Sequence, residues 1–165
     1  MVEYKSISRI GSRTINEDCV GMHQKGEEYG FFLADGLGGH GKGDLASQEA
    51  VKQAILEFED GGSTEETMQR IFEQAQEKVL ELQRQEQNCY GMKTTLLIGK
   101  KDVQCGHIGD SRVYWFWHKK LMGRTLDHSV PQMLVNIGEI EEEEIRSHPD
   151  RNRLLRVMGS EWETP

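Results

Sequence analysis

The amino-acid sequence predicts an α+β fold, and three observations support this class. EYKSISR (3–9) alternates polar and apolar side chains, and EYGFFLAD (28–35) has the composition of a more buried strand. Two long stretches with helical spacing follow, and alternation returns over residues 93–118. Strands, then two helices, then a run of strands is an α+β order, whereas a parallel sheet would alternate strand and helix along the chain.

Two amphipathic helices are predicted between the strands. Residues 43–58 carry apolar side chains at helical spacing, and DGG at 60–62 ends that helix. Ser63 and Glu66 form a capping box for the second helix, which we expect to end near Asn88. The apolar positions are Leu45, Ala46, Ala50, Ala54, Ile55 and Phe58 in the first helix and Met68, Ile71, Phe72, Ala75, Val79 and Leu82 in the second.

The second half of the chain is predicted to begin with three successive strands. These are KTTLLIG (93–99), DVQCGHIGD (102–110) and SRVYWFWH (111–118), which we expect to pair in antiparallel fashion. Residues 129–138 and 139–148 suggest two short helices, and 152–159 a further strand or turn. The run Glu141–Glu144 is interpreted as a solvated helix face.

Length and composition indicate one domain over residues 1–165 and exclude several functional classes. The chain contains no apolar run near the roughly 18 residues of a membrane helix, and its start lacks the apolar core of a secretory signal. We therefore expect a cytoplasmic protein without a membrane partner. Lys and Arg number 20 against 28 Asp and Glu, and this net charge of −8 disfavours nucleic-acid binding.

Cysteine usage argues against three kinds of site. Cys19, Cys89 and Cys105 are an odd number, widely spaced and without a CxxC pair, so a disulfide framework or a Cys-rich zinc site is not expected. An electropositive setting for a nucleophilic thiolate is not evident in the sequence.

The loop FFLADGLGGHGKG (31–43) allows three interpretations. Its glycines match G-x-G-x-x-G, the dinucleotide fingerprint, but Asp35 and Asp44 would then place negative charge near a pyrophosphate. A purely structural glycine turn is the second interpretation. The third is a cation site, because a carboxylate at a strand end, followed by glycines that permit close backbone approach, suits a hard ion bound through oxygen.

Further oxygen ligands for such an ion lie elsewhere in the chain. Glu17 and Asp18 come before the second predicted strand, with Arg13 near them, and Asp110 lies in a predicted turn between strands. Each of these residues would by itself be ordinary on a solvated surface or in a turn.

Together, six ordered segments resemble motifs of the metal-dependent PPM-type (type 2C) serine/threonine protein phosphatases, in their bacterial branch. The resemblance spans essentially the whole chain. R-x-x-N-E-D matches Arg13, Asn16, Glu17 and Asp18; A-D-G-x-G-G-H matches residues 34–40; T-T-L matches 94–96; G-D-S-R matches 109–112; D-H-S matches 127–129; and H-P-x-R-N matches 148–152.

This resemblance implies an antiparallel β-sandwich flanked by helices, in α-β-β-α layers, with two Mg²⁺ or Mn²⁺ ions at one end of the sheets. Water activated by the ions would hydrolyse phosphoserine or phosphothreonine without a covalent intermediate. The implied metal ligands are Glu17, Asp35, which bridges the ions, the carbonyl of Gly36, Asp18, which supports metal-bound water, and Asp110 for a third, weaker ion. Arg13 would grip the phosphate and, with Asp18 and Asp35, form the catalytic set. His40 is expected to be structural, and the general acid is unassigned.

The sequence departs from the family pattern in its last part. Family domains continue with a late S-D-G and a terminal D-N, each of which supplies a metal-binding aspartate, and this sequence contains neither. We therefore expect one of the two ions to be held weakly and the late strands of the sandwich to be missing. A second chain is one means of covering the apolar faces that this would leave.

Two hypotheses follow from the resemblance. The first is a phosphatase acting on phosphorylated proteins, opposed by a serine/threonine kinase. The second is a phosphatase-like regulatory or binding module with little or no turnover. The arginine and carboxylate motifs favour the first, and the absent late aspartates favour the second.

Overall fold

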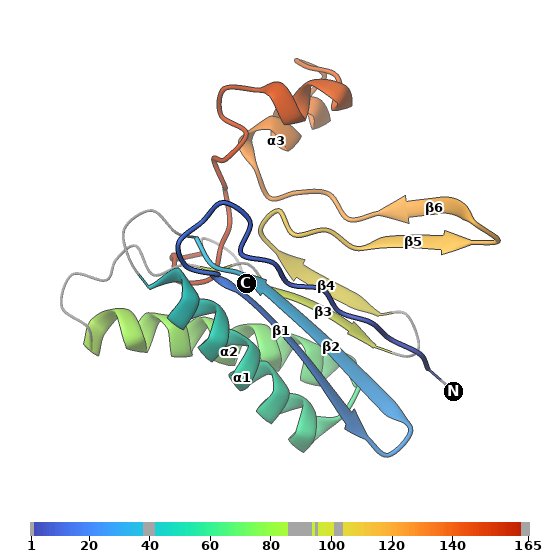
Figure 1. The fold of residues 1–165 in the computed structure, drawn as a ribbon, viewed down its shortest axis with the longest axis vertical. Helices are drawn as coiled ribbons and strands as arrows, with labels where there is room; N and C mark the ends of the chain where they lie inside the picture. The colour runs from blue at the N-terminus through green and yellow to red at the C-terminus, as the bar shows by residue number, and fades with distance from the viewer. Residues whose placement is uncertain (1, 38–41, 86–93, 95, 101–103, 163–165) are drawn as a thin grey trace.

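In the computed structural model the chain forms two antiparallel sheets, a pair of long helices and a short helical region near its C-terminus (Figure 1). The structure describes residues 2–37, 42–85, 94, 96–100 and 104–162. The larger sheet has the order β1 (Asp18–Lys25), β2 (Glu28–Asp35), β3 (Leu96–Lys100) and β4 (Cys105–Ile108). The smaller sheet pairs β5 (Tyr114–Trp117) with β6 (Lys120–Arg124). The predicted α+β class is confirmed.

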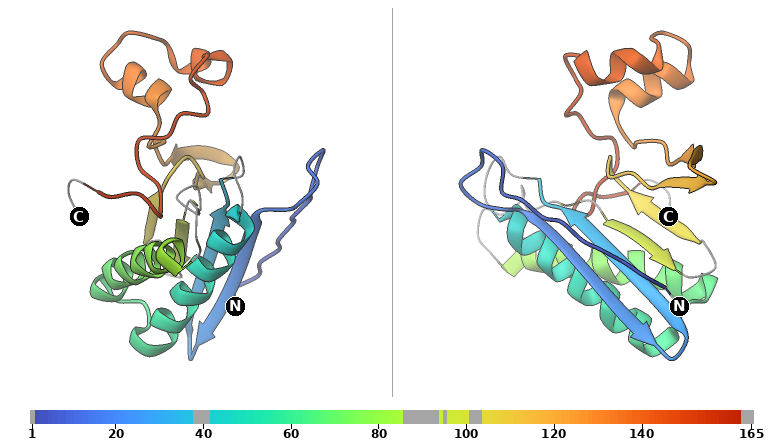
Figure 2. Two further views of the ribbon diagram at one scale, coloured as in Figure 1. Left: turned by 90° about the vertical axis from the view of Figure 1, so that its left-hand side faces the viewer. Right: turned by 45° about the vertical axis from the view of Figure 1, so that its right-hand side comes forward.

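The two long helices cover one face of the larger sheet. The helices α1 (Gly43–Gly61) and α2 (Glu65–Gln85) lie side by side, with α1 against β1 and β2 (Figure 2). Strand β2 turns Phe32 and Ala34 into this layer, and the ring of Phe32 meets that of Phe58 edge-on at 5.9 Å. The predicted apolar stripes of both helices therefore form the core.

The start of α2 differs from the sequence prediction. The hydroxyl of Thr64 accepts a hydrogen bond from the backbone N–H of Thr67 (3.1 Å), so Thr64 caps the helix. The backbone N–H of Ser63 instead donates to the carboxylate of Glu28 (2.9 Å), and the predicted Ser63–Glu66 capping box is wrong. The predicted end near Asn88 lies outside the described residues.

The N-terminal strand prediction is also wrong. Residues 3–9 are extended but join no sheet, because the described strand β1 has β2 as its neighbour and the alternation of residues 3–9 finds no ladder partner. This segment lies instead over the second face of the larger sheet, where the ring of Tyr4 is 5.7 Å from that of Phe31. Strands β1 and β6 were not predicted.

The later strands confirm three sequence predictions and correct their pairing. The predicted strands correspond to β3, β4 and β5, but β5 pairs with β6 as a separate hairpin. Strand β5 exposes Trp115, Phe116 and Trp117, with 41%, 62% and 68% of each residue accessible. Apolar surface is therefore exposed on this hairpin.

The C-terminal region consists of α3 (Val130–Asn136) and a 3₁₀ helix, η1 (Glu142–Ser147). Both short helices were predicted, the second of them as an ordinary helix. Residues 152–159 form isolated bridges in place of a strand, at Leu154 and Met158. Among the described residues, no helix combines the length and apolar character needed to cross a membrane.

Candidate active site

Two aspartates face each other where β1 begins and β2 ends. Asp18 and Asp35 are partners in the antiparallel register, so their side chains lie on the same face of the sheet. This face also carries Phe31 and Leu33 and lies opposite the one that α1 covers, because Phe32 and Ala34 occupy the helix-covered face. The predicted pair of carboxylates therefore meets at one edge of the second face.

The electrostatic environment of Asp35 shows that further charged groups gather there. Partial burial raises the pKa of Asp35, and the negative charges of Asp18, Asp110 and Glu17 raise it further, to about 6, while Arg13 lowers it. Partial burial also raises the pKa of Asp110. The other four predicted side chains thus lie within electrostatic reach of Asp35, although the five residues come from three separate segments of the chain.

Glu17 and Gly36 are joined through their backbones. The N–H of Gly36 donates to the carbonyl of Glu17 (3.0 Å), and the hydroxyl of Ser47 donates to the same carbonyl (2.6 Å). A Cβ on Gly36 would lie 2.7 Å from that carbonyl oxygen and would collide with the backbone of Gly43. Glycine is therefore required at position 36 by the close approach of α1, and this packing fixes the backbone next to Asp35.

Thr94 holds the end of β2 from the other side. Its hydroxyl donates to the carbonyl of Asp35 (2.9 Å), and its backbone exchanges hydrogen bonds with Met158. Thr94 is fully buried. Sequence reasoning found Thr94 only as part of a motif and missed Ser47 altogether, because a serine on a helix face gives no signal of the loop it will meet.

Arg13 lies on the solvent-exposed side of the cluster of acidic side chains. Its guanidinium is 3.9 Å from the carboxylate of Glu17, with 70% of the arginine side chain exposed against 18% of the glutamate. Such an exposed pair contributes little to stability, since water screens it. The guanidinium therefore keeps donors available for another anion at this edge.

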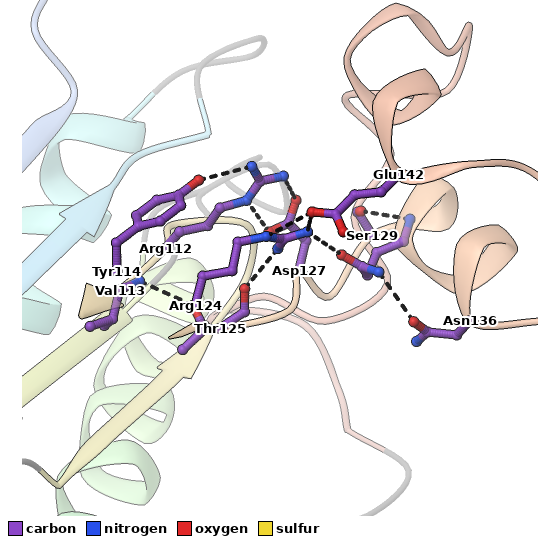
Figure 3. Close-up of polar contacts among 10 residues, drawn as sticks. Arg112, Val113, Tyr114, Arg124, Thr125, Asp127, Ser129, Asn136 and Glu142 are labelled. Atoms are coloured by element: carbon purple, nitrogen blue, oxygen red, sulfur yellow. Dashed lines mark hydrogen bonds and ion pairs between the residues drawn. The ribbon is translucent and has the colours of Figure 1, made fainter. Parts of the chain in front are cut away.

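The G-D-S-R and D-H-S motifs meet and set the position of Asp110. The N–H of Gly109 donates to Nδ1 of His128 (3.2 Å), and the N–H of His128 donates to the carbonyl of Gly109 (2.9 Å). Arg112 donates through Nε (2.6 Å) and Nη2 (2.5 Å) to the two carboxylate oxygens of Asp127 (Figure 3). These bonds brace the turn that carries Asp110 against the loop before α3.

The donor set fits a hard cation in its chemistry and charge. Four carboxylates and the backbone around Gly36 supply oxygen atoms. Burial first, and then the repulsion of neighbouring carboxylates, raise the pKa of Asp35, and a bound cation would stabilise its charged form. In the part of the chain that the structure describes, no three Asp, Glu, His or Cys side chains converge as a ready-made metal cluster. Residues 38–41, which include His40 and two of the fingerprint glycines, lie outside the described part.

Two of the three cysteines lie in the described part of the chain. Cys19 and Cys105 are free thiols, and burial raises the pKa of Cys19, which disfavours its thiolate. Cys89 lies outside the described residues.

Comparison with known proteins identifies the family. The model of the protein phosphatase 2C family matches residues 7–131. The chain belongs to this family. It is 33% identical over 159 residues to the serine/threonine phosphatase stp of Listeria monocytogenes, a match that covers 88% of this chain and 62% of the relative. The chain therefore spans less than two thirds of the length of this curated relative.

Solved structures of family members share the fold. The serine/threonine phosphatase Stp1 of Staphylococcus aureus superposes with a TM-score of 0.84 at 27% identity, over 94% of this chain and 65% of that one. The catalytic domain of the serine/threonine phosphatase PstP, solved with two manganese ions, has a TM-score of 0.71 at 30% identity, over 92% of this chain and 64% of that one. The resemblance to bacterial PPM-type phosphatases and the predicted fold class are thereby confirmed, and the dinucleotide interpretation is not supported.

Proposed function

We propose that this chain is the metal-binding part of a protein serine/threonine phosphatase that hydrolyses phosphoserine and phosphothreonine with Mn²⁺ or Mg²⁺. The observation that carries the proposal is that Asp18 and Asp35 face each other across β1 and β2, while the charges of Arg13, Glu17 and Asp110 also act on Asp35. The relatives described above are named serine/threonine phosphatases, which supports turnover over a binding-only module.

The chain's own residues would divide the work as follows. Glu17, Asp35 and the carbonyl of Gly36 would hold one ion, with Asp35 shared with a second ion. Asp18 and Asp110 would add negative charge and hydrogen-bond acceptors around them. When bound, such ions supply Lewis acidity and lower the pKa of water enough to make a nucleophile available near neutral pH.

Arg13 would bind the phosphate of the substrate. Its planar fork of donors matches two phosphate oxygens at once, and its exposed position leaves room for a phosphorylated side chain to approach. In this role Arg13→Ala would raise the KM for a phosphopeptide more than it lowers kcat.

The test is hydrolysis of p-nitrophenyl phosphate and of a phosphothreonine peptide with Mn²⁺, with Mg²⁺ and with chelator. The metal-loaded chain should turn over both substrates, and chelator should stop the reaction. Asp35→Asn should abolish the divalent-dependent rate, whereas Asp150→Asn, on an exposed loop away from the carboxylates, should leave it unchanged. Hydrolysis that survives Asp35→Asn in a folded sample would refute the site.

Lack of turnover is informative when it is combined with a binding measurement. Mn²⁺ should raise the melting temperature of the wild-type chain and of Asp150→Asn, but not that of Asp35→Asn. A folded chain that binds Mn²⁺ and hydrolyses neither substrate would overturn the proposal of an enzyme in favour of a binding module.

The proposal extends to partners and location. The substrates would be phosphorylated proteins of the cytoplasm, with an opposing serine/threonine kinase and without nucleic-acid or membrane partners. Residues 1–165 would form a single phosphatase-like domain. A second chain, or further polypeptide of the same protein, would complete the sandwich over the exposed β5–β6 hairpin.

A further inference from the structure

A cavity of about 560 Å³ lies between the base of the β5–β6 hairpin and the C-terminal helical region. Four arginines line it, namely Arg112, Arg124, Arg146 and Arg151, together with the carboxylates of Asp110, Asp127 and Glu142. This concentration of guanidinium groups contrasts with the net charge of −8 on the whole chain. The volume falls within the range of cavities that bind small ligands or single side chains.

Two of the four arginines are already neutralised by the cavity's own carboxylates. Arg112 makes the two-pronged contact with Asp127, and Arg124 donates to Glu142 (Figure 3). These pairs tie the hairpin to the loop before α3 and to η1, so they form a braced wall. The charges within each pair largely cancel, and neither pair includes Arg146 or Arg151.

Arg146 and Arg151 are the positive groups left over. Within the described part of the chain, neither guanidinium makes a hydrogen bond or ion pair with another residue, and both residues are exposed. Each guanidinium presents five N–H donors in a fixed plane, a geometry that suits the oxygens of phosphate or carboxylate. An anion that entered the cavity would therefore find unused donors on two neighbouring segments.

The cavity adjoins the candidate active site through Asp110. Asp110 lines the cavity, and its charge also acts on Asp35 in the cluster of acidic side chains at the candidate active site. A peptide whose phosphorylated residue lies at these acidic side chains could place a neighbouring side chain in the cavity, next to Arg146 and Arg151. The cation expected at the carboxylates would offset the charge of Asp110, which otherwise would repel the incoming anion.

We propose that this cavity binds a second anionic side chain of the phosphoprotein substrate, a phosphate or a carboxylate, close in sequence to the phosphorylated residue that is hydrolysed. The inference rests on the proposed function and adds a substrate preference to it. Arg146 and Arg151 would provide the contacts, and the Arg112–Asp127 and Arg124–Glu142 pairs would hold the walls in place.

The experiment measures peptide binding by fluorescence anisotropy in Mn²⁺. Three labelled peptides share one sequence and a non-hydrolysable phosphonate analogue of phosphothreonine. At a neighbouring position they carry a phosphonate analogue of phosphoserine, a glutamate or an alanine. The wild-type chain should bind the doubly anionic peptides about tenfold tighter than the alanine peptide, since hydrogen bonds between charged groups are the strong ones.

The variants assign this preference to the cavity. In Arg146→Ala/Arg151→Ala the ratio of Kd values between the alanine peptide and the doubly anionic peptides should fall to about one, whereas Arg153→Ala, an exposed arginine outside the cavity lining, should keep the wild-type ratio. Circular dichroism verifies folding of each variant. The relative affinities of the phosphonate and glutamate peptides then distinguish phosphate from carboxylate as the ligand.

Failure of this inference is distinct from failure of the proposed function. Equal wild-type affinity for all three peptides, or equal loss of preference in Arg153→Ala, would overturn the cavity as a subsite even in an active enzyme. A chain that cannot hydrolyse p-nitrophenyl phosphate but keeps the preference, and loses it in the double variant, would refute the enzyme and retain the subsite.

Discussion

Replacing Asp127 by alanine should destabilise the protein by about 2 kcal/mol. Asp127 accepts both donors of the Arg112 fork, at 2.6 and 2.5 Å, with 5% of the aspartate side chain exposed. Removing one partner of a buried ion pair costs about 3–5 kcal/mol, because the other charge is left without compensation. Here 30% of the Arg112 side chain is exposed, so water recovers part of that cost and we expect the lower figure.

The measurement is the free energy of unfolding from urea titration, together with the melting temperature. For a chain of this size a loss of about 2 kcal/mol corresponds to a fall of about 4–8 °C. The matched control is Asp150→Ala, which removes an exposed aspartate whose side chain makes no hydrogen bond or ion pair with the residues that the structure describes. This variant should change stability by less than about 0.5 kcal/mol.

The double variant Arg112→Met/Asp127→Ala distinguishes the energetic effect of an unpaired charge from that of lost packing. Removing both charges should cost less than Asp127→Ala alone, because no buried guanidinium is then left unpaired. A loss below about 0.5 kcal/mol for Asp127→Ala, or a double variant less stable than the single one, would refute the argument that this ion pair braces the turn at Asp110.

Three further predictions concern the packing around the site. Ser47→Ala should cost about 1–2 kcal/mol in urea unfolding, because the buried serine hydroxyl donates to the carbonyl of Glu17 (2.6 Å); a cost no greater than that of an exposed serine control would contradict this. Gly36→Ala should cost about 1–3 kcal/mol and weaken Mn²⁺ binding, because its Cβ would lie 2.7 Å from the same carbonyl oxygen; unchanged stability and affinity would show that α1 yields freely. The rings of His107 and His128 stack at 4.6 Å, and burial lowers the pKa of both. The charges of His107 and Arg156 lower the pKa of His128 further, whereas Asp127 raises the pKa of both histidines. At these two positions the unfolded chain therefore takes up more protons as the pH falls through 6.5, so the histidines lower stability below that pH, against the opposite contribution of Asp35. The melting temperature of His107→Phe should fall less than that of the wild-type chain over this window.

The sequence by itself determined the elements whose pattern is local. Strand β2 was predicted with its observed bounds, because a continuous apolar run ending in Asp35 and glycine signals a buried strand and its end. The helices α1 and α2 followed from apolar side chains every three or four residues. The six motifs identified the family before any geometry was known, since the order and spacing of specific polar residues is a property of the chain alone.

Tertiary structure decided the strands that depend on a partner. Residues 3–9 alternate like a strand but find no ladder, whereas Asp18–Lys25 forms β1 despite a weak pattern interrupted by Gly21. That glycine is explained by packing, because a Cβ there would lie 2.7 Å from the side chain of Val51 on α1. Strand pairing is a long-range interaction, so alternation within one segment cannot specify it.

The candidate site shows the same division. The sequence offered Glu17, Asp18, Asp35 and Asp110 as candidate oxygen ligands, and the family resemblance assigned them to the site. Only the fold places Asp110 within electrostatic reach of Asp35, 75 positions earlier in the chain. Arg112 and Arg151 belong to sequence motifs, but their meeting with Arg124 and Arg146 around one cavity was not predicted, because the four arginines come from separate segments of the chain. Charged side chains from distant segments influence one another only when tertiary packing brings them close together.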